Sequence, residues 1–161
     1  MRKMFFATMT LLLSVGFINA QNAAPAKTEK VATATPKKQA PKLVVPAAVK
    51  AQIKALYPQV KDVKWEKEGS NYEAEIEQKG SEDMSVLLDA QGTVLETETD
   101  IKVSELPAAV RTYVAQKLGN QPIKEAAKIV KADKTIEYEA EVGKKDYLFD
   151  SNGNFLKIAG K

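Results

Sequence analysis

Glutamates occupy every second position in two short segments of this sequence, which is the spacing of side chains on one face of a β-strand. These residues are Glu73, Glu75 and Glu77 in YEAEIE, and Glu137, Glu139 and Glu141 in IEYEAEV. Two such rows on a solvated sheet face would capture a cation or a basic partner, or supply the two acids of a glycosidase. The simpler interpretation is a solvated face whose carboxylates pair with lysines of neighbouring strands, such as Lys64 and Lys67.

Two absent residue types narrow the chemistry further, because the chain has neither histidine nor cysteine. Without histidine, the commonest general base and transition-metal ligand are missing, and a Ser-His-Asp triad cannot form. Without cysteine, there are no disulfides, thiol nucleophiles or thiolate metal sites. Partner binding is therefore favoured over metal binding, and an enzyme with acidic catalysis ranks last.

A second motif, Asp-x-x-Gly-x-x-Leu, begins at Asp89 in DAQGTVL and again at Asp150 in DSNGNFL. A calcium loop would need several carboxylates within about 12 residues, ending in a bidentate glutamate. Acidic residues follow the first copy, whereas none follows the second. A duplicated metal site should keep its ligands in both copies. We therefore predict hairpin turns, in which Asp bonds nearby backbone N–H groups and Gly provides a position with φ > 0.

Three motifs recur in the same order, which indicates an internal duplication. VPAAVK at 45–50 returns as LPAAVR at 106–111, with the same offset of 61 residues as the Asp-x-x-Gly motif. YEAEIE returns with an offset of 66, so the second copy gains residues before this strand and loses them after it. We expect repeat 1 over about 43–104 and repeat 2 over about 105–161.

Each repeat begins with a predicted helix, because Pro46 and Pro107 suit a first helical turn. Apolar residues then recur at helical spacing: Val49, Ile53 and Leu56 in the first helix, and Val110, Val114 and Leu118 in the second. The first helix should end near Tyr57-Pro58 and the second near Gly119-Asn120.

Four alternating segments follow each helix and predict strands. They span about 63–68, 72–77, 84–88 and 93–98 in repeat 1, and 127–131, 135–142, 146–149 and 154–158 in repeat 2. Trp65 and Tyr72 share the parity of apolar neighbours, so we expect both in the core under the helix. The predicted fold class is α+β: two tandem repeats, each a helix followed by a four-stranded antiparallel sheet, with the helices packed on one sheet face. Whether the repeats share one sheet is left open.

The N-terminus has the composition of a targeting segment. Arg2 and Lys3 precede an apolar run that ends near Ala20, as in a secretory signal peptide. The run is shorter than the roughly 20 apolar residues that span a bilayer. Residues 21–42 are rich in Ala, Lys, Thr and Pro and predict a disordered linker. We therefore expect a signal peptide at 1–20, a linker at 21–42, a domain at 43–161, and no membrane span after cleavage.

The formal charge of +3 does not describe the predicted domain, since residues 43–161 hold 17 basic and 20 acidic side chains. A nucleic-acid-binding domain needs a basic face, so nucleic acid is not an expected partner.

Together, VPAAVKAQIKALYPQVKDVKWEKEG, the alternating strand and the Asp-x-x-Gly turn resemble the PepSY-like, β-lactamase-inhibitor-like (BLIP-like) domains common in Bacteroidetes envelopes. The resemblance covers about residues 43–161 in two copies. The second copy lacks the Tyr-Pro helix ending and has Lys131 roughly where Trp65 would recur. The resemblance implies a tandem helix-plus-sheet fold, an exported location and binding or inhibition of other proteins. It implies no catalytic residues.

We therefore expect an exported, non-enzymatic, inhibitor-like protein, periplasmic or secreted, that is a monomer and needs no cofactor or metal. It should recognise a protein or peptide of the cell envelope through the open sheet face, with the six glutamates as partner-binding residues. The alternative is an envelope cation-binding or acid-sensing module that uses the two glutamate rows.

Overall fold

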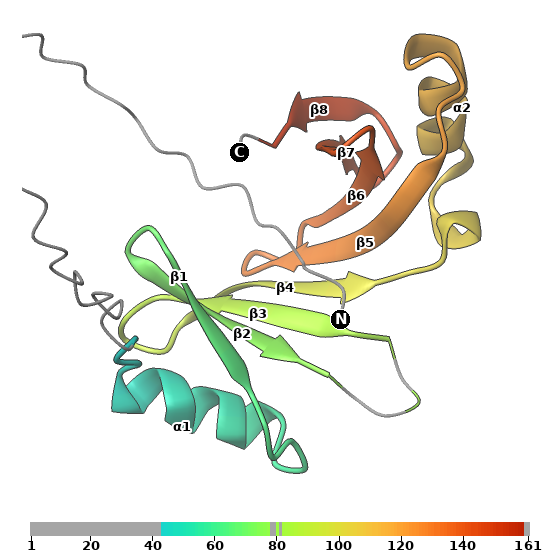
Figure 1. Cartoon of the computed structure of the whole chain (residues 1–161). Helices are drawn as coiled ribbons and strands as arrows, with labels where there is room; N and C mark the ends of the chain where they lie inside the picture. Colours follow the sequence, from blue (N-terminus) through green and yellow to red (C-terminus); the bar gives the residue numbers. More distant parts are fainter. Residues whose placement is uncertain (1–42, 78–79, 81, 160–161) are drawn as a thin grey trace, which may run out of the picture. The chain divides into compact units, whose positions relative to one another are not determined.

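A computed structural model describes residues 43–77, 80 and 82–159 of the chain (Figure 1). The elements are α1 (Ala47–Leu56), β1 (Lys64–Glu68), β2 (Asn71–Ile76), β3 (Met84–Leu88), β4 (Val94–Asp100), the 3-10 turn η1 (Val103–Glu105), α2 (Ala108–Lys117), β5 (Ile123–Lys131), β6 (Ile136–Val142), β7 (Lys145–Asp150) and β8 (Phe155–Ile158). The predicted signal peptide and linker lie outside the described residues.

All eight strands form one antiparallel sheet, in which each strand pairs with the next along the chain. This answers the question that the sequence left open: the four strands predicted for each repeat are one half of a single sheet rather than a sheet of their own. The join is the β4–β5 pairing, which runs from Glu96 opposite Lys131 to Asp100 opposite Ala127. Both strands are longer than predicted, since β4 continues to Asp100 and β5 begins at Ile123.

An extended β5–β6 hairpin explains why the sheet is continuous. Ala126 lies opposite Ala140, as Trp65 lies opposite Ala74, so Ala126 occupies the position equivalent to Trp65 and the expectation for Lys131 was wrong. The sequence distance between equivalent residues of the two halves is 61 before the tip of the β5–β6 hairpin and 66 after it. The added residues include Val130 and Lys131, which pair with Thr97 and Glu96 of β4.

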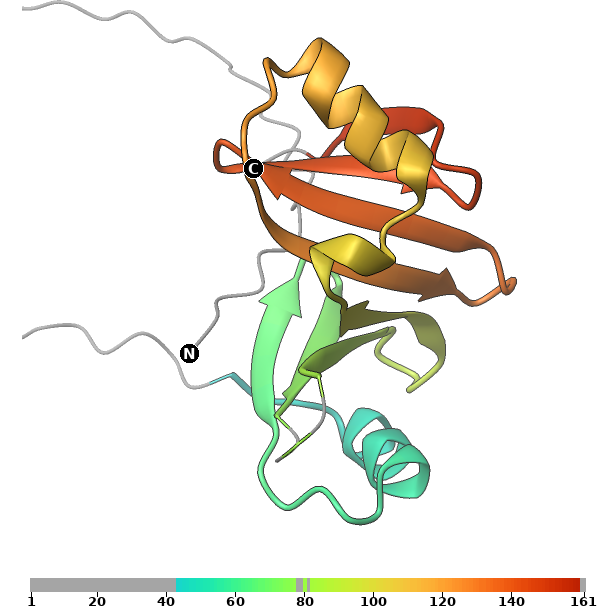
Figure 2. The same cartoon turned by 90° about the vertical axis from the view of Figure 1, so that its right-hand side faces the viewer.

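Both helices lie on the same side of the sheet (Figure 2). Val49 and Ile53 of α1 are buried against Ala74, Val86 and Leu88, and they form a first core. Trp65 and Tyr72 pack against this core, as their parity predicts. The third predicted stripe residue, Leu56, is instead exposed at the helix end.

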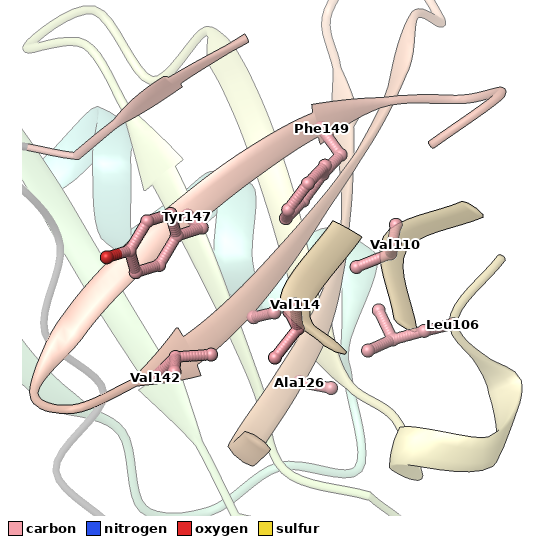
Figure 3. Packing of buried hydrophobic residues seen from close by; sticks show 8 residues of the cluster. Leu106, Val110, Val114, Ala126, Val142, Tyr147 and Phe149 are labelled. Carbon is pink, nitrogen blue, oxygen red and sulfur yellow. The ribbon is translucent and has the colours of Figure 1, made fainter. Parts of the chain in front are cut away.

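A second core lies under α2 (Figure 3). Val110 and Val114 of the helix pack on the strand residues Ala126, Val142, Tyr147 and Phe149, with Leu106 before the helix. Phe149 is fully buried, and Tyr113 of α2 meets its ring edge-on at a centroid distance of 5.4 Å. Two separate cores under one sheet therefore hold the two helices in place.

The two Asp-x-x-Gly segments are hairpin turns, as predicted. Asp89 accepts backbone hydrogen bonds from Gln91 (2.9 Å) and Thr93 (2.8 Å). Asp150 accepts the equivalent bonds from Asn152 and Asn154 at the same two distances. Gly92 and Gly153 have φ of 87° and 84°.

Each of these turns packs against the start of the helix in its own half. A Cβ atom on Gly92 would lie 2.9 Å from the Ala48 carbonyl oxygen, and one on Gly153 would lie 2.8 Å from the Ala109 Cβ. This contact explains why the Pro-Ala-Ala and Asp-x-x-Gly motifs recur together. No helix among the described residues has the length and apolarity to cross a bilayer.

Candidate functional site: the carboxylate face of the sheet

The strand register places the two predicted glutamate rows on one sheet face, opposite the helices. Glu75, Ser85, Glu98, Ile129 and Glu137 lie opposite one another across the consecutive strands β2 to β6. Side chains of directly paired residues share a face, and this face is the reverse of the one that carries the cores. We call it the carboxylate face.

Five of the six predicted glutamates belong to the carboxylate face, and Glu77 does not continue its row. β2 ends at Ile76, and Glu77 is exposed beyond it. The two lysines predicted to pair with these glutamates lie on different faces of the sheet. Lys64 contacts Glu75, whereas Lys67 lies on the helix side, with its Nζ 3.7 Å from the centre of the Tyr72 ring.

The central acids of this face come from β4, and they were missed as site residues. Glu96, Glu98 and Asp100 alternate with Thr97 and Thr99, so their row lies between the two predicted rows. The alternation in VLETETD was visible in the sequence. Alternation does not show, however, that this row lies between the other two, because strand order decides which rows become neighbours.

Two lysines neutralise part of the face. Lys64 Nζ lies 2.6 Å from Glu66 Oε1 and 2.7 Å from Glu75 Oε1. Lys131 Nζ lies 2.5 Å from Glu96 Oε2 and 3.5 Å from Glu137 Oε2, so it connects β4, β5 and β6. The two glutamates hydrogen-bonded to Lys64 raise the pKa of its ammonium well above its usual value.

Three other glutamates, Glu73, Glu98 and Glu139, form no ion pair within the described part of the chain. Burial, followed by the charges of Glu68, Glu75 and Glu66, raises the pKa of Glu73 to about 8, although Ser85 opposes this shift. Burial and the neighbouring Asp146 and Glu141 raise the pKa of Glu139 to about 8. Burial and Glu139 raise the pKa of Glu98 well above its usual value. At neutral pH Glu73 and Glu139 therefore favour the protonated form.

Three buried polar atoms lack a hydrogen-bond partner within the described residues: Glu68 Oε2, Glu73 Oε1 and Ser85 Oγ. They belong to adjacent strands. Glu73 lies directly opposite Glu66 and Leu87, so Glu68 on β1 and Ser85 on β3 are its diagonal neighbours on the same face. Burial raises the pKa of Glu68 as well. Buried polar atoms are normally paired, so this group of orphans is the most unusual feature of the face.

Metal chelation is a poor fit to this arrangement. The described residues contain no group of three acidic side chains placed to hold a metal ion. Acids two strands apart are separated by roughly 10 Å along the backbone spacing of a sheet, which spreads the charge. A surface of this kind suits several separate cationic groups better than one ion.

A hollow of about 990 Å³ lies at one end of the first strands. Its described lining consists of Gln59, Val60, Lys61, Asp62, Val63, Lys64, Glu75, Glu77 and Asp83. Glu75 belongs both to this hollow and to the carboxylate face, so the two surfaces adjoin. Glu77, which leaves the sheet row, lines the hollow instead.

The chain matches the family model described as "Putative beta-lactamase-inhibitor-like, PepSY-like" twice, over residues 27–96 and 89–157. No protein in the curated comparison matches. Among solved structures, a DUF2874 family protein from Bacteroides uniformis is 25% identical, with a TM-score of 0.62, and the match covers 70% of this chain and 87% of that one.

A BLIP-like protein from Bacteroides fragilis is 26% identical, with a TM-score of 0.54 over 73% of this chain and 87% of that one. A protein from Bacteroides eggerthii described as "putative periplasmic" is 21% identical, with a TM-score of 0.63 over 71% of this chain and 88% of that one. The last similarity supports the fold alone.

Proposed function

This chain belongs to the PepSY-like family, and we propose that it is an exported, non-catalytic protein that binds a protein or peptide through the carboxylate face. The observation that carries the proposal is that lysines pair with only some of the acidic side chains on that face. Glu73, Glu98 and Glu139 are buried or half-buried without a cation. A buried carboxyl group without a cation either stays protonated or destabilises the fold when it ionises, so a binding function is a physical reason for these residues.

The non-catalytic part of the proposal rests on composition and on likeness. The chain lacks the histidine and cysteine that most acid–base and nucleophilic sites use. The family is described as inhibitor-like, and one similar structure is described as BLIP-like. The glutamates of the face are then contact residues rather than acids that act on a substrate.

The exported location rests on the proposed signal peptide at residues 1–20, the linker at 21–42 and a folded domain at 43–161. The B. eggerthii protein of the same fold is described as "putative periplasmic". Fractionation of producing cells, with N-terminal sequencing of the recovered protein, tests this assignment. We expect an envelope or secreted form that begins at Gln21; an uncleaved chain in the cytoplasm would contradict it.

A capture experiment tests the binding function. The chain from Gln21 to Lys161 is immobilised and exposed to envelope extract, alongside a variant with Glu73, Glu75, Glu139 and Glu141 changed to glutamine. The control is Glu82→Gln, an exposed residue in the β2–β3 connection. A recovered protein should rebind in purified form to the wild type and the control, but not to the quadruple variant. Equal rebinding by all three would exclude the carboxylate face.

A proton-responsive module is the second candidate, and the raised pKa values of Glu73 and Glu139, about 8 each, favour it. In this role the face would gain charge as pH rises through that value and would change shape or partner. Hydrogen exchange of β2 and β6 measured on both sides of the transition tests this role. Protection that does not change with pH would remove it.

A further inference from the structure

The orphaned atoms Glu68 Oε2, Glu73 Oε1 and Ser85 Oγ form one acceptor-rich site on the carboxylate face. Glu73 is only 3% exposed and Ser85 is fully buried. Their strands β1, β2 and β3 are neighbours, and each of the two partner groups contributes to the pKa of Glu73. The Ser85 hydroxyl is the one neutral donor of this group and can serve only one acceptor at a time. The two carboxyl groups therefore offer more acceptor oxygens than the site has donors, and a donor from outside would complete it.

The charged groups around this site come from every neighbouring strand. They are Lys64, Glu66 and Glu68 on β1, Glu75 on β2, Glu96 and Glu98 on β4, and Lys131 on β5. Both lysines already contact other glutamates. Within the described residues neither carboxyl group of the site forms an ion pair, although the charge of Lys131 partly offsets the rise in the pKa of Glu68.

The chemistry of the missing donor follows from these acceptors. It must carry positive charge, because two of the three acceptors are carboxylates. It must offer several N–H groups, because the acceptors lie on three strands. Guanidinium provides five N–H donors in a planar fork that matches a carboxylate, whereas ammonium is a point charge with three donors. A metal ion is a poorer fit, since only two of the three groups are acidic.

We propose that a side chain of arginine from the partner enters the carboxylate face between β1 and β3 and donates hydrogen bonds to Glu73, Glu68 and Ser85. This inference rests on the proposed binding function and specifies the partner as a protein or peptide with an accessible arginine. The charge of the surrounding face strengthens the interaction, because the other carboxylates of β2 and β4 attract the same cation.

Proton release accompanies this binding. Glu73 is mostly protonated at pH 7, since its pKa is raised to about 8. A guanidinium beside it favours the carboxylate and lowers that pKa, so a proton leaves the site as the arginine enters. Affinity should therefore rise with pH up to the pKa of the free site and level off above it.

The test uses acetyl-Gly-Arg-Gly-amide as the probe and the same peptide with citrulline, which is neutral and nearly isosteric, as its control. The protein is the chain from Gln21 to Lys161, which keeps both cores. Binding is followed by NMR shifts of backbone amides at millimolar peptide, and proton release by calorimetry in buffers with different ionisation enthalpies.

We expect saturable shifts at Glu73, Ser85 and their β1 neighbours with the arginine peptide, at least tenfold weaker binding of the citrulline peptide, and net proton release at pH 7. Glu73→Gln should weaken binding at least tenfold and abolish the release, while Glu82→Gln should match the wild type. Equal binding of both peptides, shifts confined to other surfaces, or no shifts at all would overturn the inference.

The inference and the binding function can fail separately. If a captured partner loses affinity with Glu98→Gln and Glu139→Gln but not with Glu73→Gln, the face binds its partner without the proposed arginine. If the arginine peptide binds as described but no envelope protein depends on the face, the site exists and the proposed function fails.

Discussion

The pH dependence of stability tests the account of Glu73 most directly, and the substitution to make is Glu73→Gln. The folded protein raises the pKa of this carboxyl from 4.5 to about 8. Between these values the folded state keeps the proton and the unfolded state has lost it. The unfolded state therefore binds fewer protons, and the free energy of unfolding falls as pH rises. The contribution of Glu73 is complete below pH 4.5 and is lost as pH passes the folded value.

The size of the effect follows from the shift. One pKa unit corresponds to about 1.4 kcal/mol, so the full shift sets a ceiling of about 5 kcal/mol between acid and alkaline conditions. Relaxation and water entry reduce such penalties in real proteins, and we expect about 1–2 kcal/mol from this residue. Glutamine cannot ionise, so the variant should gain stability relative to the wild type as pH rises.

Urea unfolding of the wild type, Glu73→Gln and Glu82→Gln at several values from about pH 5 to about pH 9 measures this difference. The lowered pKa values of Asp89, Asp133 and Asp150 place their titration below the window. Glu82→Gln should run parallel to the wild type. A constant difference between Glu73→Gln and the wild type at every pH would show that Glu73 ionises normally and would refute the argument.

Three other substitutions test the fold by urea unfolding. Gly153→Ala should cost about 2–3 kcal/mol of stability, because it adds a Cβ 2.8 Å from the Ala109 Cβ at φ of 84°. Its control, Gly119→Ala, has φ of 66° and open space around the added Cβ, and should lose only the conformational part of about 1 kcal/mol. Equal losses would mean that the turn does not pack on α2. Phe149→Ala should cost about 3–5 kcal/mol of stability, because Phe149 is fully buried. Phe155→Ala should cost much less, because Phe155 is 39% exposed. A larger loss for Phe155→Ala would show that Phe149 is not at the centre of the second core. Lys131→Met should cost about 1–3 kcal/mol of stability near neutral pH, because it leaves Glu96 and Glu137 without their cation. The same loss of stability at acid pH would argue against an ionic role for Lys131.

The helices and turns of this protein follow from local sequence. Pro46 and Pro107 precede the two helices, and Tyr57 and Leu118 end them within two residues of the predicted positions. The Asp-x-x-Gly turns needed only their own side-chain and backbone bonds to be recognised. These features depend on contacts between residues that are close in the sequence, so short motifs are enough to predict them.

The carboxylate face was predictable only in part. Alternation placed Glu73, Glu75, Glu139 and Glu141 on one face of their strands, and the register confirms this parity. Alternation ends where a strand ends, and Glu77 lies one residue beyond β2, so it does not continue the row. The predicted solvated rows also differ from the structure, in which Glu73 is buried and its pKa is raised, because solvation depends on neighbouring strands rather than on the strand itself.

The sequence by itself determined the helices, the turns, the parity of each strand and the doubled arrangement of motifs, because each is a local pattern of side-chain size and polarity. Only the tertiary structure decided that the strands form one sheet, since β4 and β5 pair through residues about 30 positions apart. That pairing also set Glu98 between Glu75 and Glu137, while the β1–β2 and β2–β3 pairings brought Glu68, Glu73 and Ser85 together at the proposed site. Charge and burial at a site are sums over neighbours, and neighbours across a sheet are chosen by strand order and register.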